Sequence, residues 1–355
     1  MLMAYPSLQL NMNRYTKLAL FAGLAISLIG CSPKTPLYIY TWADYIDPEL
    51  IQKFERENDC KVVIDTFDSN ETMLAKLLAG GGGYDIITPT DYVMPHLISA
   101  DLIERLDSEK LPLVVKNLDK SFAIEHALTY NVPYAFSCIG ILWRKDKVPS
   151  DLTFEDWNDM FDSRLKGRVC MMNDIREVIG LGLKMKGYSV NSTSKAELDE
   201  SVEVAKLWKS KSVKMDNEAY RTGIPSGEFY TAMAYNSDAV MLMVNDPETI
   251  GYALPTNGII ASMDVFCILK KSKSKELAYK FIDMFYNPTN AAKNAQFNCA
   301  PMPVLGMFDA LEEEYKAVPF MKVTDEMRSK CEYIQDVGEA LSLYSKAWDK
   351  IKSTR

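Results

Sequence analysis

The chain has 355 residues, of which 48% are hydrophobic and 25% are charged, an ordinary balance for a globular protein of roughly two domains. Its formal net charge of -8 comes from 48 acidic against 40 basic side chains, and the sequence has no dense basic run. This balance argues against a nucleic-acid backbone as the partner and favours cationic ligands.

The first 30 residues have the features of an export signal. Arg14 and Lys17 precede an apolar run over residues 18–29, which is too short to span a membrane. The run ends in Gly30-Cys31, and this ending resembles the lipobox of bacterial lipoproteins, in which the cysteine is lipidated and becomes the mature N-terminus. We therefore expect residues 1–30 to be a lipoprotein signal peptide and Cys31 to carry lipid. The alternative is an ordinary export signal with an incidental cysteine.

Six cysteines follow Cys31, and an even number in an exported protein is compatible with disulfides. Four of the six lie in or beside apolar, strand-like segments, where a small buried thiol is the more common state: Cys60, Cys138, Cys170 and Cys267. We predict no particular pairing. The sequence has no CxxC motif and only two histidines, so that it gives no indication of a metal site.

Strand-like and helical patterns alternate in the first third of the chain. Three segments are strand-like: residues 37–41, 61–67 and 84–88. Asp47 and Pro48 are expected to begin the first intervening helix, and Asp68-Ser69-Asn70 to cap the second. The β-α-β-α-β order predicts parallel strands that are covered by helices.

Ligands of such sheets bind beyond the carboxyl ends of the strands. Two segments that leave these ends are Trp42-Ala43-Asp44-Tyr45 and Thr88-Pro89-Thr90-Asp91-Tyr92. Each segment alone is more simply explained as a solvated loop with capping acids. Because both are aromatic and acidic and should meet at one edge of the sheet, together they predict a binding site.

A second α/β pattern begins after residue 132. The strand-like segment 169–172 is followed by Asp174 and Glu177, whose spacing fits a helix capping box as well as a pair of ligand-binding acids. Another expected strand, residues 229–234, leads to Tyr235 and to Asp238.

Residues 259–269 read IIASMDVFCIL, an apolar β-type run that carries one carboxylate, Asp264. An ionised carboxylate in such a run is costly unless it is paired or faces a wet cleft, so Asp264 is the strongest single indication of function in the sequence. The C-terminal segment, residues 322–352, is expected to be helical, with an apolar face that core packing explains.

The candidate site residues are therefore acids and aromatic rings at the expected strand ends. A cleft that is rich in anions and walled by rings suits an elongated cation, whose ammonium groups pair with carboxylates and whose methylene chain lies on ring faces. Polyamines have this form. Each buried ammonium must recover its lost hydration, which explains why several acids are expected.

At these residues the chain also resembles the spermidine/putrescine-binding proteins of bacterial ABC importers, from about Leu37 to the C-terminus. The most specific stretches are Tyr40-Thr41-Trp42-Ala43-Asp44-Tyr45, Asp68-Ser69-Asn70-Glu71-Thr72-Met73, Tyr84-Asp85 with Pro89-Thr90, Arg176-Glu177-Val178 with Gly187-Tyr188, and Met263-Asp264. The resemblance implies the α/β fold of a type II periplasmic binding protein, in which two lobes close about a hinge. Each lobe would be a mainly parallel sheet covered by helices, one comprising residues 37–137 plus 261–303, the other 138–260 plus 304–355.

The resemblance also implies site residues. Positions that contact polyamine in spermidine-type members are matched by Trp42, Tyr45, Thr90, Tyr92, Asp174, Glu177 and Asp264. Acids of putrescine-type members are matched by Asp44 and Asp238, and Tyr235 stands where tryptophan is usual. Ser262, Ala300 and Ile334 replace an aromatic residue, a tyrosine and a glutamine. The class of ligand therefore follows from the resemblance, whereas the preferred polyamine does not.

From these observations we expect a periplasmic lipoprotein, anchored to a bacterial membrane, that binds spermidine and/or putrescine as a monomer and delivers it to the permease of an ABC importer. We expect no enzymatic activity and no cofactor, because Gly180-Leu181-Gly182 and Gly80 to Gly83 both lack the rest of a nucleotide-binding motif. The acidic charge balance argues against a nucleic-acid partner. Two alternatives stay open. One is a protein of the same fold for another cationic or metal solute, and the other is a surface lipoprotein with an adhesin role.

Overall fold

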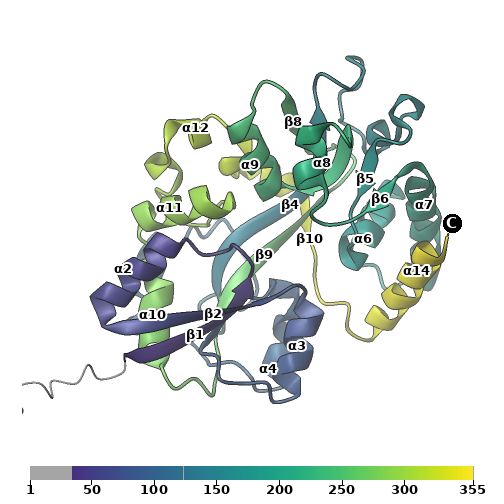
Figure 1. Cartoon of the computed structure of the whole chain (residues 1–355). Helices are drawn as coiled ribbons and strands as arrows, with labels where there is room; N and C mark the ends of the chain where they lie inside the picture. Colours follow the sequence, from purple (N-terminus) through teal and green to yellow (C-terminus); the bar gives the residue numbers. More distant parts are fainter. Residues whose placement is uncertain (1–33, 123, 355) are drawn as a thin grey trace, which may run out of the picture.

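The computed structural model describes residues 34–122 and 124–354, so the predicted signal peptide and Cys31 lie outside the described residues. Its strands are β1 (Thr35–Trp42), β2 (Cys60–Phe67), β3 (Ile86–Ile87), β4 (Val132–Arg144), β5 (Val169–Met171), β6 (Lys214–Met215), β7 (Thr231–Tyr235), β8 (Ile250–Ala253), β9 (Ile259–Ile268) and β10 (Cys331–Tyr333). They form one sheet in the order β2-β1-β3-β9-β4-β7-β5-β6, with β10 beside β9 and β8 beside β4 (Figure 1).

The helices follow the strands in chain order. They are α2 (Pro48–Asn58), α3 (Asn70–Leu78), α4 (Met94–Ser99), α5 (Pro112–Asn117), α6 (Ile175–Met185), α7 (Lys195–Lys211), α8 (Tyr220–Ser226), α9 (Asn236–Asn245), α10 (Lys275–Met284), α11 (Pro288–Asn298), α12 (Glu313–Lys316), α13 (Asp325–Lys330) and α14 (Leu341–Ser353). In the described part of the chain no helix is both long and apolar enough to cross a membrane.

Local sequence explains where the first two helices begin. The Asp47 carboxylate accepts a hydrogen bond from the Glu49 backbone N–H, and Pro48 occupies the first turn of α2, where its missing N–H costs nothing. The Ser69 hydroxyl likewise accepts from the Thr72 backbone N–H at the start of α3. The predicted alternation of strands and helices is therefore confirmed here, and β1 pairs in parallel with both β2 and β3.

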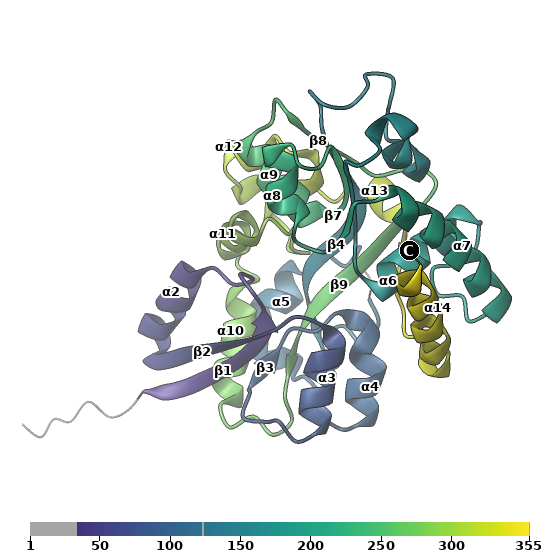
Figure 2. The same ribbon diagram turned by 45° about the vertical axis from the view of Figure 1, so that its right-hand side comes forward.

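Side-chain alternation along β1 places helices on both faces of this end of the sheet. Leu37 and Ile39 pack in one core with Leu50 and Phe54 of α2. Tyr40, which points to the opposite face, packs in another core with residues of α3 and α4. Figures 1 and 2 show α2 and α10 on one side of β1 and β2, and α3 and α4 on the other.

Strands β4 and β9 connect the two ends of the sheet. They pair antiparallel, with Val132 opposite Phe266 and Cys138 opposite Ala261. Beyond them β4 pairs with β7, which in turn pairs in parallel with β5. The sheet is thus parallel toward both ends and antiparallel at its centre, where the chain crosses from one part of the molecule to the other (Figure 2).

A further core lies at this far end of the sheet. Helices α6, α7 and α14 share one core, in which the predicted apolar face of the C-terminal helix is buried through Tyr344. The sequence assigns residues 304–355 to the second lobe, but buried side chains between residues 304 and 321 pack in the same core as α10 and α11. The lobe boundaries predicted from the sequence stay a prediction.

Two expectations need correction. The strand predicted over residues 84–88 is reduced to β3, Ile86–Ile87, and the C-terminal segment is not wholly helical. Residues Cys331–Tyr333 form β10, which pairs with β9. A strand of three residues is too short to show a period in the sequence, so that only its tertiary partner reveals it.

The six cysteines after Cys31 are all free thiols, and the four that the sequence placed in apolar segments are buried. The prediction of small buried thiols at these positions is therefore confirmed.

Candidate functional site

The candidate site lies where strands from both parts of the molecule end. On one side β1 leads into Asp44 and Tyr45, and the chain after β3 leads into Thr90. On the other side β5 leads to Asp174, the residue before α6, and β7 ends at Tyr235. The order of these elements explains the location, because carboxyl ends of parallel strands meet at one edge of a sheet.

Between these strand ends lies a cavity of about 380 Å³. All ten residues that the sequence predicts for the site line it: Trp42, Asp44, Tyr45, Thr90, Tyr92, Asp174, Glu177, Tyr235, Asp238 and Asp264. The structure therefore brings the whole predicted set together, although the residues come from segments more than 200 positions apart in the chain.

Asp264 of β9 is held by neutral donors. The Thr90 hydroxyl donates to its Oδ1 at 2.7 Å, and the Tyr45 hydroxyl donates to its Oδ2 at 2.5 Å. Asn70 in turn fixes Thr90 by accepting from its backbone N–H and donating to its hydroxyl, both at 3.0 Å. The carboxylate is 9% exposed, and burial raises its pKa to about 6 against the opposing effect of the two hydroxyl donors. Near neutral pH the site therefore holds a buried negative charge with neutral hydrogen-bond partners.

Asp174 and Glu177 form a second acidic group. Asp174 caps α6, since its Oδ1 accepts from the backbone N–H of Arg176 at 2.9 Å and of Glu177 at 3.1 Å. The helix cap by Asp174 is thus confirmed, but among the described residues no hydrogen bond returns from the Asp174 backbone N–H to Glu177 to complete a capping box. Both side chains also line the cavity. Within the described residues Glu177 Oε2 is buried without a hydrogen-bond partner. Burial, and then the charge of Asp174, raise the pKa of Glu177 well above its ordinary value.

Asp238 on α9 forms the third acidic place in the cavity, and it has a cationic partner. Arg221 of α8 places Nε 2.9 Å from its Oδ1, and the Tyr220 hydroxyl donates to its Oδ2 at 2.5 Å. Asp238 is 6% exposed. Burial raises its pKa, while Arg221 and Tyr220 act in the opposite direction.

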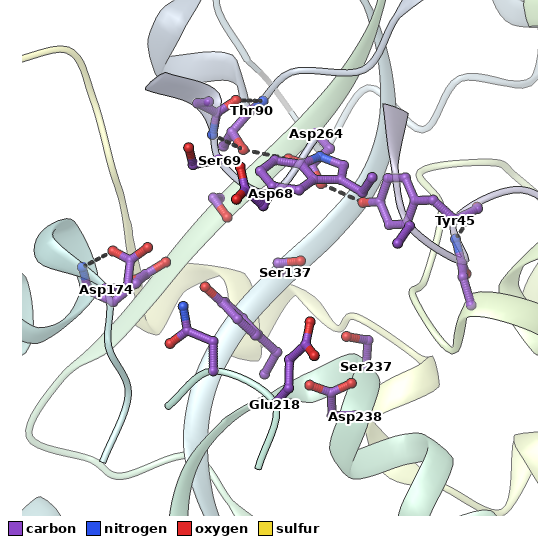
Figure 3. Close-up of a pocket in the computed structure, with 18 of the residues that line it drawn as sticks. Tyr45, Asp68, Ser69, Thr90, Ser137, Asp174, Glu218, Ser237, Asp238 and Asp264 are labelled. Atoms are coloured by element: carbon purple, nitrogen blue, oxygen red, sulfur yellow. Dashed lines mark hydrogen bonds between the residues drawn. The ribbon is translucent and has the colours of Figure 1, made fainter. Parts of the chain in front are cut away.

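Figure 3 shows these three acids at separate places on the cavity wall, with Ser137 of β4 between them. Asp174 lies on one side, Asp264 lies beside Thr90 and Tyr45, and Asp238 lies with Ser237 and Glu218. A ligand with several charged groups could therefore contact more than one of them at once.

Aromatic rings supply part of the wall. Trp42 packs edge-on against Phe67 with 4.4 Å between ring centroids, and Tyr45 packs edge-on against Tyr134 at 5.1 Å. Tyr92 accepts from the Asn70 amide at 3.2 Å and donates to Glu71 at 3.2 Å. These contacts hold ring faces at the cavity, a geometry that suits methylene chains and cations.

The cavity is strongly acidic. Eight carboxylates line it: Asp44, Asp68, Glu71, Asp174, Glu177, Glu218, Asp238 and Asp264. Among the described residues that line the cavity, two guanidinium groups oppose them, those of Arg176 and Arg221. Arg176 is 4% exposed and is bound to the Gln335 carbonyl and to Asn191, each at 2.9 Å. The field in the cavity therefore attracts cations.

Several of the residues that line the cavity were not predicted from the sequence. Asp68 to Glu71 follow β2 as Ala43 to Tyr45 follow β1. Because the sequence also fits a helix cap at this point, the equivalence of the two segments was not recognised. Glu218 and Arg221 follow β6, a strand of two residues that no periodicity reveals. Of the three departures from the family pattern, Ser262 and Ile334 line the cavity, whereas Ala300 is buried beside Cys299 in the core.

Within residues 34–122 and 124–354 no group of three His, Cys, Asp or Glu side chains is arranged to hold a metal ion. The carboxylates are distributed around the cavity wall.

Comparison with known proteins decides the family. The model of the family described as bacterial extracellular solute-binding protein matches residues 49–319. The chain belongs to this family.

The relatives of this solute-binding protein are similar over nearly their whole length. A putrescine/cadaverine-binding protein of Pseudomonas aeruginosa is 29% identical, with 95% of this chain and 99% of the relative covered. The solved substrate-binding protein PotD of a Streptococcus pneumoniae spermidine/putrescine ABC transporter is 28% identical, with a TM-score of 0.77 and coverage of 90% and 98%. The solved TpPotD lipoprotein of Treponema pallidum is 29% identical, with a TM-score of 0.80 and coverage of 89% and 99%. These neighbours confirm the predicted two-lobed α/β fold.

Proposed function

We propose that this solute-binding protein binds a polyamine, spermidine and/or putrescine, outside the cytoplasm and, as a monomer, delivers it to the permease of an ABC importer. The observation that carries the proposal is the cavity between the two parts of the sheet, where eight carboxylates and several rings converge. The printed functions of the relatives, which include putrescine, cadaverine and spermidine binding, support the same class of ligand.

The chemistry of the wall supports the proposal residue by residue. A buried ammonium loses its hydration and must recover it from charged acceptors. Asp264 and the Asp174–Glu177 pair offer such acceptors at two separate places, and each pays a desolvation cost that a cation would offset. Trp42 and Tyr92 offer ring faces to the methylene chain of the ligand.

Binding would also close the molecule. The site residues are supplied by both parts of the sheet, and β4 and β9 join these parts through the antiparallel pairing described above. A ligand that contacts both sides stabilises the closed form in proportion to its preference for that form. In this mechanism β4 and β9 serve as the hinge, and the closed form is what the permease recognises.

Calorimetric titration of the purified protein tests the ligand class. Bound small molecules are first removed by reversible unfolding and dialysis, and putrescine, cadaverine, spermidine and spermine are then titrated, with thiamine and lysine as controls. We expect one-to-one binding of at least one polyamine. Ligand at 100 times its dissociation constant should also stabilise the fold by roughly 2.7 kcal/mol. Failure of all four polyamines with folded protein would refute the proposed function.

Anchoring through Cys31 is a separate part of the proposal. It rests on the apolar run that ends in Gly30-Cys31, and the TpPotD relative is itself a lipoprotein. Mass spectrometry of the membrane-associated protein should find a mature chain that begins at a lipid-modified Cys31. The variant Cys31→Ser should be recovered without lipid, whereas an unmodified Cys31 in the native protein would contradict the anchor.

A further inference from the structure

Two serines lie side by side on the strands that join the two parts of the sheet. Ser137 of β4 is opposite Ser262 of β9 in the antiparallel register, and both line the cavity. Directly opposed residues point to the same face of a sheet, with Cβ atoms about 4.5 to 5.5 Å apart. The next pair in the register, Cys138 and Ala261, points the other way and is buried in a core. The serine pair, Ser137 and Ser262, therefore presents two neighbouring hydroxyl groups to the cavity.

Ser262 differs from the other buried hydroxyl groups in having no protein partner. Six Ser and Thr side chains are buried in the part of the chain that the structure describes. Five of them have a hydroxyl that is hydrogen-bonded to another protein group: Thr41, Thr88, Thr90, Ser201 and Thr231. Among the described residues the hydroxyl of Ser262, which is 9% exposed, makes no such bond, and neither does that of the partly buried Ser137. Because an unpaired hydroxyl is costly, the serine pair must be bonded by what occupies the cavity.

The surroundings of the serine pair select the kind of group that can bond it. Figure 3 shows Ser137 among the acids of the cavity, with Asp174 and Asp264 at different places around it. Asp264 lies two residues after Ser262 on the same face of β9, about 6.5 Å along the strand, a distance that a spacer of three or four methylene groups spans. The acidic wall favours a cation. A secondary ammonium group has two N–H donors, one for each hydroxyl oxygen.

We propose that Ser137 and Ser262 are specificity-determining residues that bind the internal secondary ammonium group of spermidine, so that the protein prefers spermidine to a diamine of the same length. The terminal ammonium groups of spermidine pair with Asp264 and with the Asp174–Glu177 pair. A diamine offers only methylene groups to the serine pair, and both hydroxyl groups then stay unpaired once water is expelled. This inference rests on the proposed function and refines it.

The test compares spermidine with 1,8-diaminooctane, which has the same chain length and a methylene group in place of the internal ammonium. Dissociation constants are measured by calorimetry for wild type and for the double variant Ser137→Ala/Ser262→Ala, which removes only the two hydroxyl groups. We expect wild type to bind spermidine at least tenfold more tightly than 1,8-diaminooctane. In the double variant this affinity ratio should fall at least tenfold, because a hydrogen bond to a charged group contributes roughly a factor of ten or more. The fall should come from weaker spermidine binding, with the affinity for 1,8-diaminooctane unchanged within about threefold.

Three further variants accompany the double variant. Ser137→Ala and Ser262→Ala each remove one of the two acceptors, and each should give a ratio between those of wild type and the double variant. Ser210→Ala is the matched control, because it removes an exposed hydroxyl group on α7, outside the cavity, and it should leave the ratio unchanged. Circular dichroism establishes that each variant is folded.

The outcomes separate the two proposals. If wild type binds a polyamine but does not prefer spermidine to 1,8-diaminooctane, or if the ratio falls less than tenfold in the folded double variant, the role of the serine pair is wrong while the proposed function stands. If wild type binds none of the polyamines, the proposed function and this refinement both fail. The wild-type preference by itself tests the inference even where a variant does not fold.

Discussion

Asp264→Asn should affect stability and binding in opposite directions. In the structure this carboxylate is buried, and within the described residues its hydrogen-bond partners are two neutral hydroxyl groups, so that burial raises its pKa to about 6. The variant removes a charge that disfavours the folded state near neutral pH. It also removes the charge with which we propose that a ligand ammonium pairs, and its cost in binding should be roughly 2 to 5 kcal/mol.

The magnitude follows from linkage. A pKa of about 6 in the folded protein against 3.8 in the unfolded chain corresponds to about 3 kcal/mol lost from the folded state once the pH is well above 6. Because the pKa of Asp264 is raised in the folded protein, its contribution to the free energy of unfolding is fully present below pH 3.8 and is lost as the pH rises through about 6. Asparagine has one acceptor oxygen for two hydroxyl donors, which costs about 1 kcal/mol. The variant should therefore be about 2 kcal/mol more stable than wild type at pH 7.5.

Urea unfolding of ligand-free protein at several pH values between 4 and 7.5 provides the assay. The difference in the free energy of unfolding between variant and wild type should grow by about 2 to 3 kcal/mol from pH 4 to pH 7.5. The hydrogen-bond cost is common to all pH values and drops out of this change. Asp309→Asn, which removes an exposed carboxylate outside the cavity, serves as the control. A constant difference for Asp264→Asn over this pH range would refute the reasoning.

Three further predictions concern ligand binding. Trp42→Ala should weaken polyamine binding at least tenfold while the protein stays folded, because the ring lines the cavity; global unfolding would show that it is a core residue. Polyamine affinity should fall by roughly tenfold per pH unit as the pH drops below about 6, because Asp264 must lose its proton to pair with an ammonium. An affinity that stays the same between pH 5 and pH 8 would contradict this prediction. Small-angle scattering should show a more compact protein with ligand, and superimposable curves would exclude closure.

Much of the fold could be predicted because its determinants are local. Asp47, Ser69 and Asp174 cap helices through backbone groups two or three residues away, a signal that the sequence carries directly. Asp264 could be singled out because a carboxylate within an apolar strand has few explanations. The short strands β6 and β10 could not be predicted, since two or three residues carry no period.

The sequence by itself determined which residue types the site contains: carboxylates and rings placed where strands end. The tertiary structure decided how their charges are balanced. Tyr45 meets Asp264 across 219 positions of the chain, and Arg221 on α8 reaches Asp238 on α9. One acid is thereby left with neutral donors and another is matched with a guanidinium. Such pairing depends on which elements pack together and on distances of a few ångströms, because the energy of a charge is set by its partners and its exposure to water.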